Sequence, residues 1–217
     1  RERTSQIIRA VAEADVDFIE VGYLHAHVQT NSMGLPREAL VHMREAAEGV
    51  PLAAMMRGTC PNAREVLVDR KGLVDLIRIP CAIQQASPAL RLAELALSMG
   101  FRVSLNLTNV SASRLEDIEH VANRIPAVDA VYLADSRGAV RPAQVPEMVR
   151  ALRKHWSGPI GFHAHDNLGF AQANAQSAIE AGCTWVDGSV AGIGLGGRNL
   201  RIDEALCLAG RTPTQTL

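Results

Sequence analysis

The 217-residue sequence has no excess of charge of either sign. Its 22 lysine and arginine residues and 23 aspartate and glutamate residues are spread evenly and give a formal net charge of −1. A chain that binds nucleic acid or an anionic membrane carries a clustered basic face, which attracts phosphate groups. The sequence therefore predicts neither nucleic acid nor membrane as a partner.

Long hydrophobic runs and paired cysteines are also absent. The apolar stretches have the length of a strand and are broken by charges, whereas roughly 20 apolar residues are needed to span a bilayer. No charged and apolar leader opens the sequence. The cysteines lack the C-x-x-C spacing of a zinc or redox site, and they are Cys60, Cys81, Cys183 and Cys207. We therefore expect a soluble, cytoplasmic protein whose cysteines are mostly small buried hydrophobic residues.

What the sequence does contain is a regular alternation of short, β-branched apolar runs with longer amphipathic stretches. Each unit is about 25 to 30 residues long, as repeated βα units predict. Composition does not shift along the chain, so we expect one domain over residues 1–217. The expected strands are residues 17–22, 52–56, 74–79, 102–107, 130–134, 160–165 and 185–189. The expected helices are residues 5–14, 37–48, 63–70, 88–99, 112–124, 142–155, 171–181 and 202–209.

This order of elements predicts an α/β fold. Seven expected strands with an unpartnered helix in front of them indicate a (β/α)₈ TIM barrel that lacks its first strand in this chain. A doubly wound open sheet is the alternative. The barrel is favoured because the units are even, and because residues that carry chemistry follow several strands rather than one switch point.

Two histidines mark the C-terminal end of the expected strand 160–165. His163 and His165 are two residues apart, so the period of a strand directs both side chains to one face, which in a barrel is the interior. Each neutral imidazole offers one nitrogen lone pair, and a pair in register therefore predicts a site for a divalent metal ion. Packing in the core is the alternative. Asp166 and Asn167 follow in a loop, where barrel active sites lie.

A glycine-rich loop follows the last expected strand. Its glycines, at positions 192, 194, 196 and 197, could hold phosphate with backbone N–H groups or could simply permit a tight turn. Asn199 could offer its side-chain oxygen to a hard cation, or it could cap the helix that starts near residue 202. Both alternatives stay open at this point.

Other polar residues are expected at the mouth of the barrel, the end where the carboxyl ends of the strands meet. Asp135 and Ser136 follow a strand and would project a carboxylate and a hydroxyl over it, unless they form a plain turn. Charges inside an apolar strand are costly unless they are paired or functional. Glu20 and Arg78 should therefore point into the site or form an internal ion pair. Arg57, just past its strand, is a candidate for binding a substrate carboxylate or a solvated surface charge.

The five remaining histidines are assigned to other places. His25 and His27 repeat the spacing of the first pair, but they follow the end of a strand and are interpreted as loop residues rather than ligands. His42, His120 and His155 fall on expected helices and should lie at the surface.

Four runs in one order, VDFIEVGY, LADSRG, FHAHDNLG and GIGLGGRN, resemble the DRE-TIM metallolyase superfamily, which is HMGL-like. Within it the chain is most similar to the 4-hydroxy-2-oxovalerate aldolases, over nearly its whole length. The His-Ala-His-x-Asn-Leu and Ala-Asp-Ser-x-Gly runs are specific, whereas the glycine loop is shared with 2-isopropylmalate synthase and 3-hydroxy-3-methylglutaryl-CoA lyase. Ser136 favours the aldolases, because the acyl-CoA members carry Asp-Thr where this chain has Asp135 and Ser136.

The resemblance implies roles for individual residues. His163 and His165 would be metal ligands, Asn199 would lie beside or on the metal, and Glu20 would be an active-site carboxylate. It also implies a first-strand motif with an Arg and an Asp ligand, a nearby His, and a C-terminal helical region that contributes a tyrosine. The sequence as given contains none of these, and we expect them to belong to the protein outside it. Otherwise Glu20 or Asp187 would serve as the anionic ligand.

The activity implied is that of a class II aldolase, which cleaves or forms 4-hydroxy-2-oxoacids through a pyruvate enolate with the help of a divalent metal ion. Mixed nitrogen and oxygen ligands favour Mn²⁺ or Mg²⁺, with Zn²⁺ or Co²⁺ able to substitute. Small 2-oxoacids and aldehydes would be the substrates. An acylating aldehyde dehydrogenase is a candidate partner, and the assembly is expected to be a homo-oligomer.

The candidate residues divide by role. The catalytic candidates are Glu20, Asp135 and Ser136, and the substrate-binding candidates are Arg57, Arg78 and Ser136. Two alternative functions remain: a Claisen-type synthase or lyase that acts on an acyl-CoA, and a non-catalytic barrel that binds an oxoacid.

Overall fold

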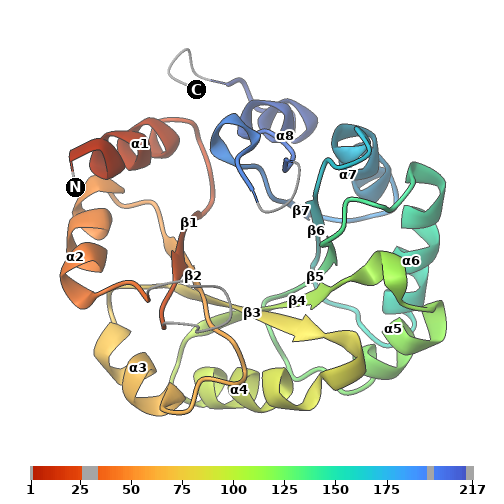
Figure 1. Ribbon diagram of the computed structural model, residues 1–217, viewed down its shortest axis with the longest axis horizontal. Coiled ribbons are helices and arrows are strands. Elements are labelled where there is room, and N and C mark those ends of the chain that lie inside the picture. The colour runs from red at the N-terminus through yellow and green to blue at the C-terminus, as the bar shows by residue number, and fades with distance from the viewer. Residues whose placement is uncertain (1, 26–33, 195–197, 214–217) are drawn as a thin grey trace.

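The centre of the protein is a sheet of seven parallel strands that curls into a ring, with the helices outside it (Figure 1). This computed structural model describes residues 2–25, 34–194 and 198–213. The strands follow one another around the ring in chain order, as repeated βα units require. The predicted barrel that lacks a strand is therefore confirmed. The doubly wound alternative is wrong, because its strand order would reverse within the sheet.

The described residues form seven strands and eight α-helices. The strands are β1 (Ile19–Tyr23), β2 (Leu52–Met55), β3 (Leu76–Ala82), β4 (Arg102–Thr108), β5 (Ala130–Asp135), β6 (Ile160–Ala164) and β7 (Trp185–Val186). The helices are α1 (Glu2–Ala12), α2 (Arg37–Ala46), α3 (Ala63–Arg70), α4 (Ser87–Ser98), α5 (Leu115–Ala122), α6 (Val145–Arg153), α7 (Ala171–Glu180) and α8 (Ile202–Leu208).

Two strands end three residues away from the expected position, whereas the other five end within one residue of it. β7 is shorter, because the chain after it turns to the last loop, where the N–H of Ser189 donates to the carbonyl of Leu200 at 2.9 Å. β3 is longer and continues through Pro80 to Ala82. Over these last residues only β4 pairs with β3, and proline is tolerated on such an edge because it removes no ladder hydrogen bond there.

Alternation along the strands separates an apolar outer layer from a polar interior. Val131 and Leu133 of β5 are fully buried in the apolar cluster that the strands share with the helices. Tyr132, between them, points inward, and its ring lies against Gly161 so closely that a Cβ there would overlap with it. The inner face of the ring therefore has room for polar side chains, which collect there.

The ring is open between β1 and β7, the two ends of the strand order. Figure 1 shows α1 and α8 on either side of this opening. Ile8 of α1 and Ile202 of α8 belong to one apolar cluster. Phe18 stacks on Trp185, with the ring centroids 5.4 Å apart. The first and last units of the repeat are thus held together by apolar contacts.

Several expectations from composition can be compared with the structure. No helix within the described ranges is both long and apolar enough to cross a membrane. Three of the cysteines are buried as expected, but Cys207, on α8, is exposed. His42, His120 and His155 are exposed, as expected, but His155 lies two residues beyond the end of α6 and not on the helix.

Candidate active site at the carboxyl end of the strands

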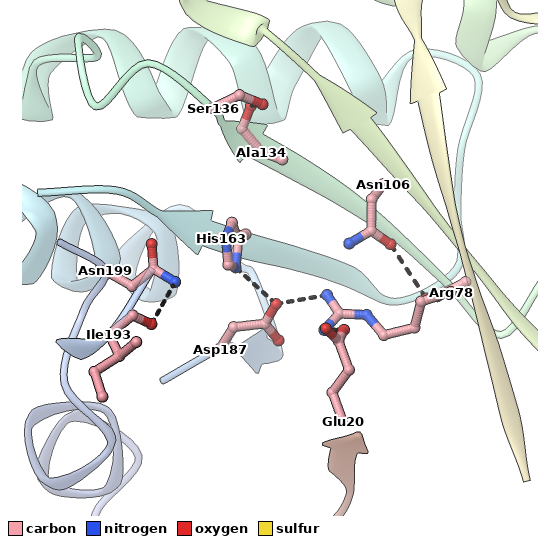
Figure 2. A network of polar contacts seen from close by, with 10 residues as sticks. Glu20, Arg78, Asn106, Ala134, Ser136, His163, Asp187, Ile193 and Asn199 are labelled. Atoms are coloured by element: carbon pink, nitrogen blue, oxygen red, sulfur yellow. Dashed lines mark hydrogen bonds and ion pairs between the residues drawn. The ribbon is translucent and has the colours of Figure 1, made fainter. Parts of the chain in front are cut away.

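A buried arginine lies in the interior of the ring. Arg78 of β3 is only 7% exposed, and it contacts carboxylates from both ends of the strand order (Figure 2). Its Nη1 donates to Glu20 Oε2 at 2.7 Å, and its Nη2 donates to Asp187 Oδ2 at 2.5 Å. The guanidinium also lies over the ring of Tyr132, 4.5 Å from the centroid. The expected internal ion pair of Glu20 and Arg78 is confirmed, and it stabilises a charge that would be costly alone.

Asp187 connects this arginine to the histidines. Its Oδ2 lies 3.0 Å from Nδ1 of His163. Burial by itself would raise the pKa of the Asp187 carboxyl, but the guanidinium of Arg78 and the hydrogen bond with His163 outweigh burial and hold the pKa well below its usual range. An ionised carboxylate has no proton to donate, so Nδ1 of His163 is the donor. In the tautomer that donates from Nδ1, the lone pair lies on Nε2, as in metal-binding histidines that are held by a carboxylate.

His165 lies just beyond the end of β6, and its ring is a neighbour of the His163 ring. The ring centroids are 5.1 Å apart, and the ring planes meet at 79°. An imidazole nitrogen binds a divalent ion at about 2.0 to 2.1 Å, which places the ring centre roughly 3.2 Å from the ion. Two such rings at an angle between about 90° and 110° would have centroids about 4.5 to 5.2 Å apart. The observed separation therefore suits two rings that share one ion.

Asn199 lies beside His165 because the last loop runs along the end of β6. Asn199 and His165 form an isolated antiparallel bridge, and the N–H of Leu200 donates to the carbonyl of Ala164 at 3.0 Å. The Oδ1 of Asn199 is buried and has no hydrogen-bond partner in the described part of the chain. Arg201, not Asn199, caps α8, so the alternative role as a helix cap is wrong. An amide oxygen with unused lone pairs suits a hard cation.

These side chains make up part of a metal site. Two imidazoles and an amide oxygen are donors that divalent ions accept. Among residues 2–25, 34–194 and 198–213, no three His, Cys, Asp or Glu side chains are grouped so that they could hold an ion. Glu20 and Asp187, considered above as anionic ligands, both pair with Arg78 instead. The donors present fit a divalent cation, which would need an anionic ligand in addition.

Gly194 gives the Asn199 side chain its space, because a Cβ at position 194 would overlap with the amide group. We predict that Gly194→Ala displaces this amide and weakens Mn²⁺ binding about 10- to 100-fold, as loss of a supporting group at a metal site does. Titration calorimetry with Mn²⁺ measures the loss. Asn199→Ala should weaken binding equally, and the double variant should bind no more weakly than either single variant. If the two losses of Mn²⁺ affinity add in the double variant, Gly194→Ala does not act through the Asn199 amide.

Asp135 and Ser136 are not part of this cluster. The Asp135 carboxylate is fully buried and accepts the backbone N–H groups of Ala139 and Val140 at 3.1 and 2.9 Å. The expectation that it projects over the mouth is therefore wrong, because the loop after β5 uses the nearest carboxylate to satisfy its own N–H groups. The Ser136 hydroxyl accepts the N–H of Asn109 at 3.1 Å, and Figure 2 shows it apart from the histidine pair.

Arg57 lies at the other side of the mouth, after β2. Its guanidinium carbon is 3.9 Å from the centroid of the Tyr23 ring. His25 packs edge-on against the same ring, with the centroids 6.4 Å apart. His27 and the glycines at 196 and 197 lie outside the described residues.

Sequence reasoning missed two residues that organise this mouth, Asp187 and Tyr23. Asp187 was considered only as a substitute ligand, although its position two residues after Trp185 is a signal that both face the interior. For Tyr23 the available signal was the preceding Gly22, since a glycine inside a strand often marks a bulge.

Comparisons with known proteins show to which proteins the chain is similar. A family model described as HMGL-like matches residues 80–215. The chain is 31% identical over 222 residues to the 4-hydroxy-2-oxovalerate aldolase of Brevibacillus brevis, and 30% identical over 226 residues to that of Geobacillus stearothermophilus. Each match covers 99% of this chain and 65% of the relative. The chain thus spans about two thirds of the length of these curated relatives.

Solved structures show the same fold. The N-terminal domain of a "putative aldolase" from Bacteroides vulgatus superposes with a TM-score of 0.84 at 29% identity, covering 97% of this chain and 73% of that one. The HMG-CoA lyase of Bacillus subtilis has a TM-score of 0.74 at 19% identity, covering 99% of this chain and 82% of that one. At the lower identity, the likeness concerns the fold alone.

Proposed function

The chain belongs to the HMGL-like family, and we propose that its site is that of a divalent-metal-dependent aldolase that cleaves or forms 4-hydroxy-2-oxoacids. The observation that supports this most directly is the contact from Arg78 through Asp187 to His163, because it fixes the ring and the tautomer of a metal-binding histidine. Curated relatives named 4-hydroxy-2-oxovalerate aldolase support the substrate class.

In this proposal His163, His165 and Asn199 hold the cation. A bound ion would supply Lewis-acid stabilisation of the negative charge that develops on a 2-oxoacid during aldol cleavage or formation. Donors of nitrogen and oxygen without thiolate favour Mn²⁺ or Mg²⁺ and admit Zn²⁺ or Co²⁺.

Arg78 and its two carboxylates set the electrostatics behind the histidine pair. One guanidinium and two carboxylates, those of Glu20 and Asp187, sum to a charge of −1, so this interior attracts a cation. Both terminal nitrogens of Arg78 are engaged by carboxylates. We therefore assign Arg78 to positioning Asp187 rather than to binding the substrate.

An activity panel with the Mn²⁺-loaded full-length protein tests the proposal. We expect pyruvate and short aldehydes to give 4-hydroxy-2-oxoacids, and we expect no thiol release from acetyl-CoA mixed with pyruvate or other 2-oxoacids. Thiol release would contradict the proposal and favour a Claisen-type synthase. Inactivity on both sets of substrates would instead favour a non-catalytic barrel.

A further inference from the structure

An irregularity in β1 brings Tyr23 onto the inner face of the ring. Glu20 pairs with Ala53 and Tyr23 pairs with Met55, so the step from Glu20 to Tyr23 spans three positions on β1 and two on β2. This is a bulge, and Gly22 within it has a φ of 120°, a value that favours glycine. Side chains alternate along a regular strand, which would put Tyr23 on the face opposite to Glu20. With the bulge, both lie on the inner face.

Tyr23 in turn supports the guanidinium of Arg57. The guanidinium carbon lies 3.9 Å from the ring centroid, close enough for a cation–π contact. Arg57 follows Met55 by two residues, so it lies on the same inner side. A guanidinium that stacks on a ring is fixed in plane, while its N–H groups still point outward from its edge. The stack thus orients a planar donor at the mouth.

The donor lacks an acceptor. Nη1 of Arg57 is buried and makes no hydrogen bond in the part of the chain that the structure describes. Leaving a buried charged donor unpaired is costly, so the arrangement implies an acceptor that is not a described residue. Arg78 already has two carboxylates, whereas no ion pair of Arg57 is found among the described residues. The acceptor that best matches two parallel N–H groups of a guanidinium is a carboxylate.

The surroundings place this donor next to the proposed reaction site. Burial raises the pKa of Tyr23, and the charges of Arg57, Glu20 and Arg78 also act on its hydroxyl. Tyr23 pairs with Met55 and Met55 pairs with Arg78, so the three residues lie side by side across β1, β2 and β3. The hydroxyl stays protonated at neutral pH.

We infer that Arg57, held flat by Tyr23, is the subsite for the substrate carboxylate, and that this pair makes the site selective for substrates with a free carboxylate. The inference rests on the proposed function, in which the carboxylate belongs to the 2-oxoacid. Tyr23 is a positioning residue here, since it acts through Arg57.

Pyruvate binding to the Mn²⁺-loaded full-length protein tests the inference, with methyl pyruvate as the uncharged comparison. Arg57→Leu should weaken pyruvate binding about 10- to 100-fold, the effect of losing a charged hydrogen-bonded pair, and should leave methyl pyruvate within about twofold. Tyr23→Leu should weaken pyruvate binding about 3- to 30-fold, whereas Tyr23→Phe keeps the ring and should stay within about twofold. At saturating pyruvate, kcat of Tyr23→Leu should be near that of the wild type.

The chain offers a matched control at the opposite end of the strands. Arg102 lies over the ring of Phe18, 4.9 Å from its centroid, in a similar stack far from the mouth. Because Phe18 also stacks on Trp185, the control variant used is Arg102→Leu, which removes the cation–π contact and keeps that ring stack. Arg102→Leu should bind pyruvate like the wild type. Wild-type affinity in Arg57→Leu, no pyruvate binding by the wild type, or equal losses for pyruvate and methyl pyruvate would overturn the inference. Arg57-dependent pyruvate binding without any aldol turnover would contradict the proposed function alone.

Discussion

Replacing His163 by alanine is expected to remove the bound divalent ion and to lower aldol turnover by roughly 10²- to 10³-fold, the range for loss of one preorganised electrostatic group. The ring that Asp187 orients is lost, and His165 with Asn199 would form too small a donor set to retain the ion. His165→Ala should have the same effect. Metal analysis of the purified protein and steady-state rates with pyruvate and an aldehyde measure both quantities.

A histidine outside the site provides the control. His155 is exposed beyond the end of α6, so His155→Ala should keep one ion per chain and the full rate. If the variants at positions 163 and 165 also retained one ion per chain, the assignment of the histidine pair as ligands would be wrong.

Arg78→Met is expected to destabilise the folded protein by about 3 to 5 kcal/mol, because it leaves the largely buried carboxylate of Asp187 without its guanidinium partner. Asp187 and Glu20 would then face each other without the cation between them. For a chain of this length the melting temperature should fall by roughly 6 to 20 °C. Urea unfolding of the metal-free protein measures the free energy without a contribution from the ion.

The destabilisation should depend on pH with a definite sign. The folded-state pKa of Asp187 lies below its unfolded value, so the stability that Arg78 confers through this carboxylate is present above the unfolded pKa of about 4 and is lost as pH falls below it. The difference in the free energy of unfolding between the wild type and Arg78→Met should therefore have its full size at pH 7 and become smaller below about pH 4.

An exposed ion pair serves as the comparison. Lys154 contacts Glu119 at 2.7 Å, but its side chain is 60% exposed, so Lys154→Met should cost less than about 1 kcal/mol. If Arg78→Met were as mild as this control at every pH, Arg78 would have no role in holding Asp187 ionised.

The barrel could be predicted from sequence because its cause is local and repeated. Each strand carries its own apolar, β-branched run, and the outer residues Val131 and Leu133 are buried as that run requires. The histidine pair was also predictable, since the separation of His163 and His165 by two residues fixes their common face whatever the neighbouring strands do.

The remainder of the site depends on pairings between strands that are distant in the sequence. Asp187 meets Arg78 only because β7 and β3 face each other across the ring, a relation that no local pattern encodes. Tyr23 faces inward because a bulge shifts β1 against β2, and although Gly22 suggests a bulge, the shift itself depends on the pairing with β2. The prediction for Asp135 failed because of a local contact. Its carboxylate accepts hydrogen bonds from N–H groups of the following loop and therefore does not point over the mouth, although the residue lies at the end of a strand.

Electron spin echo spectroscopy of the Mn²⁺-loaded protein measures most directly whether the histidine pair binds the metal. We predict ¹⁴N couplings from two imidazoles in the wild type, from one in any Mn²⁺ retained by His163→Ala or His165→Ala, and an unchanged spectrum in His155→Ala. Mn²⁺ that binds tightly to the wild type but shows no imidazole nitrogen coupling would contradict the account.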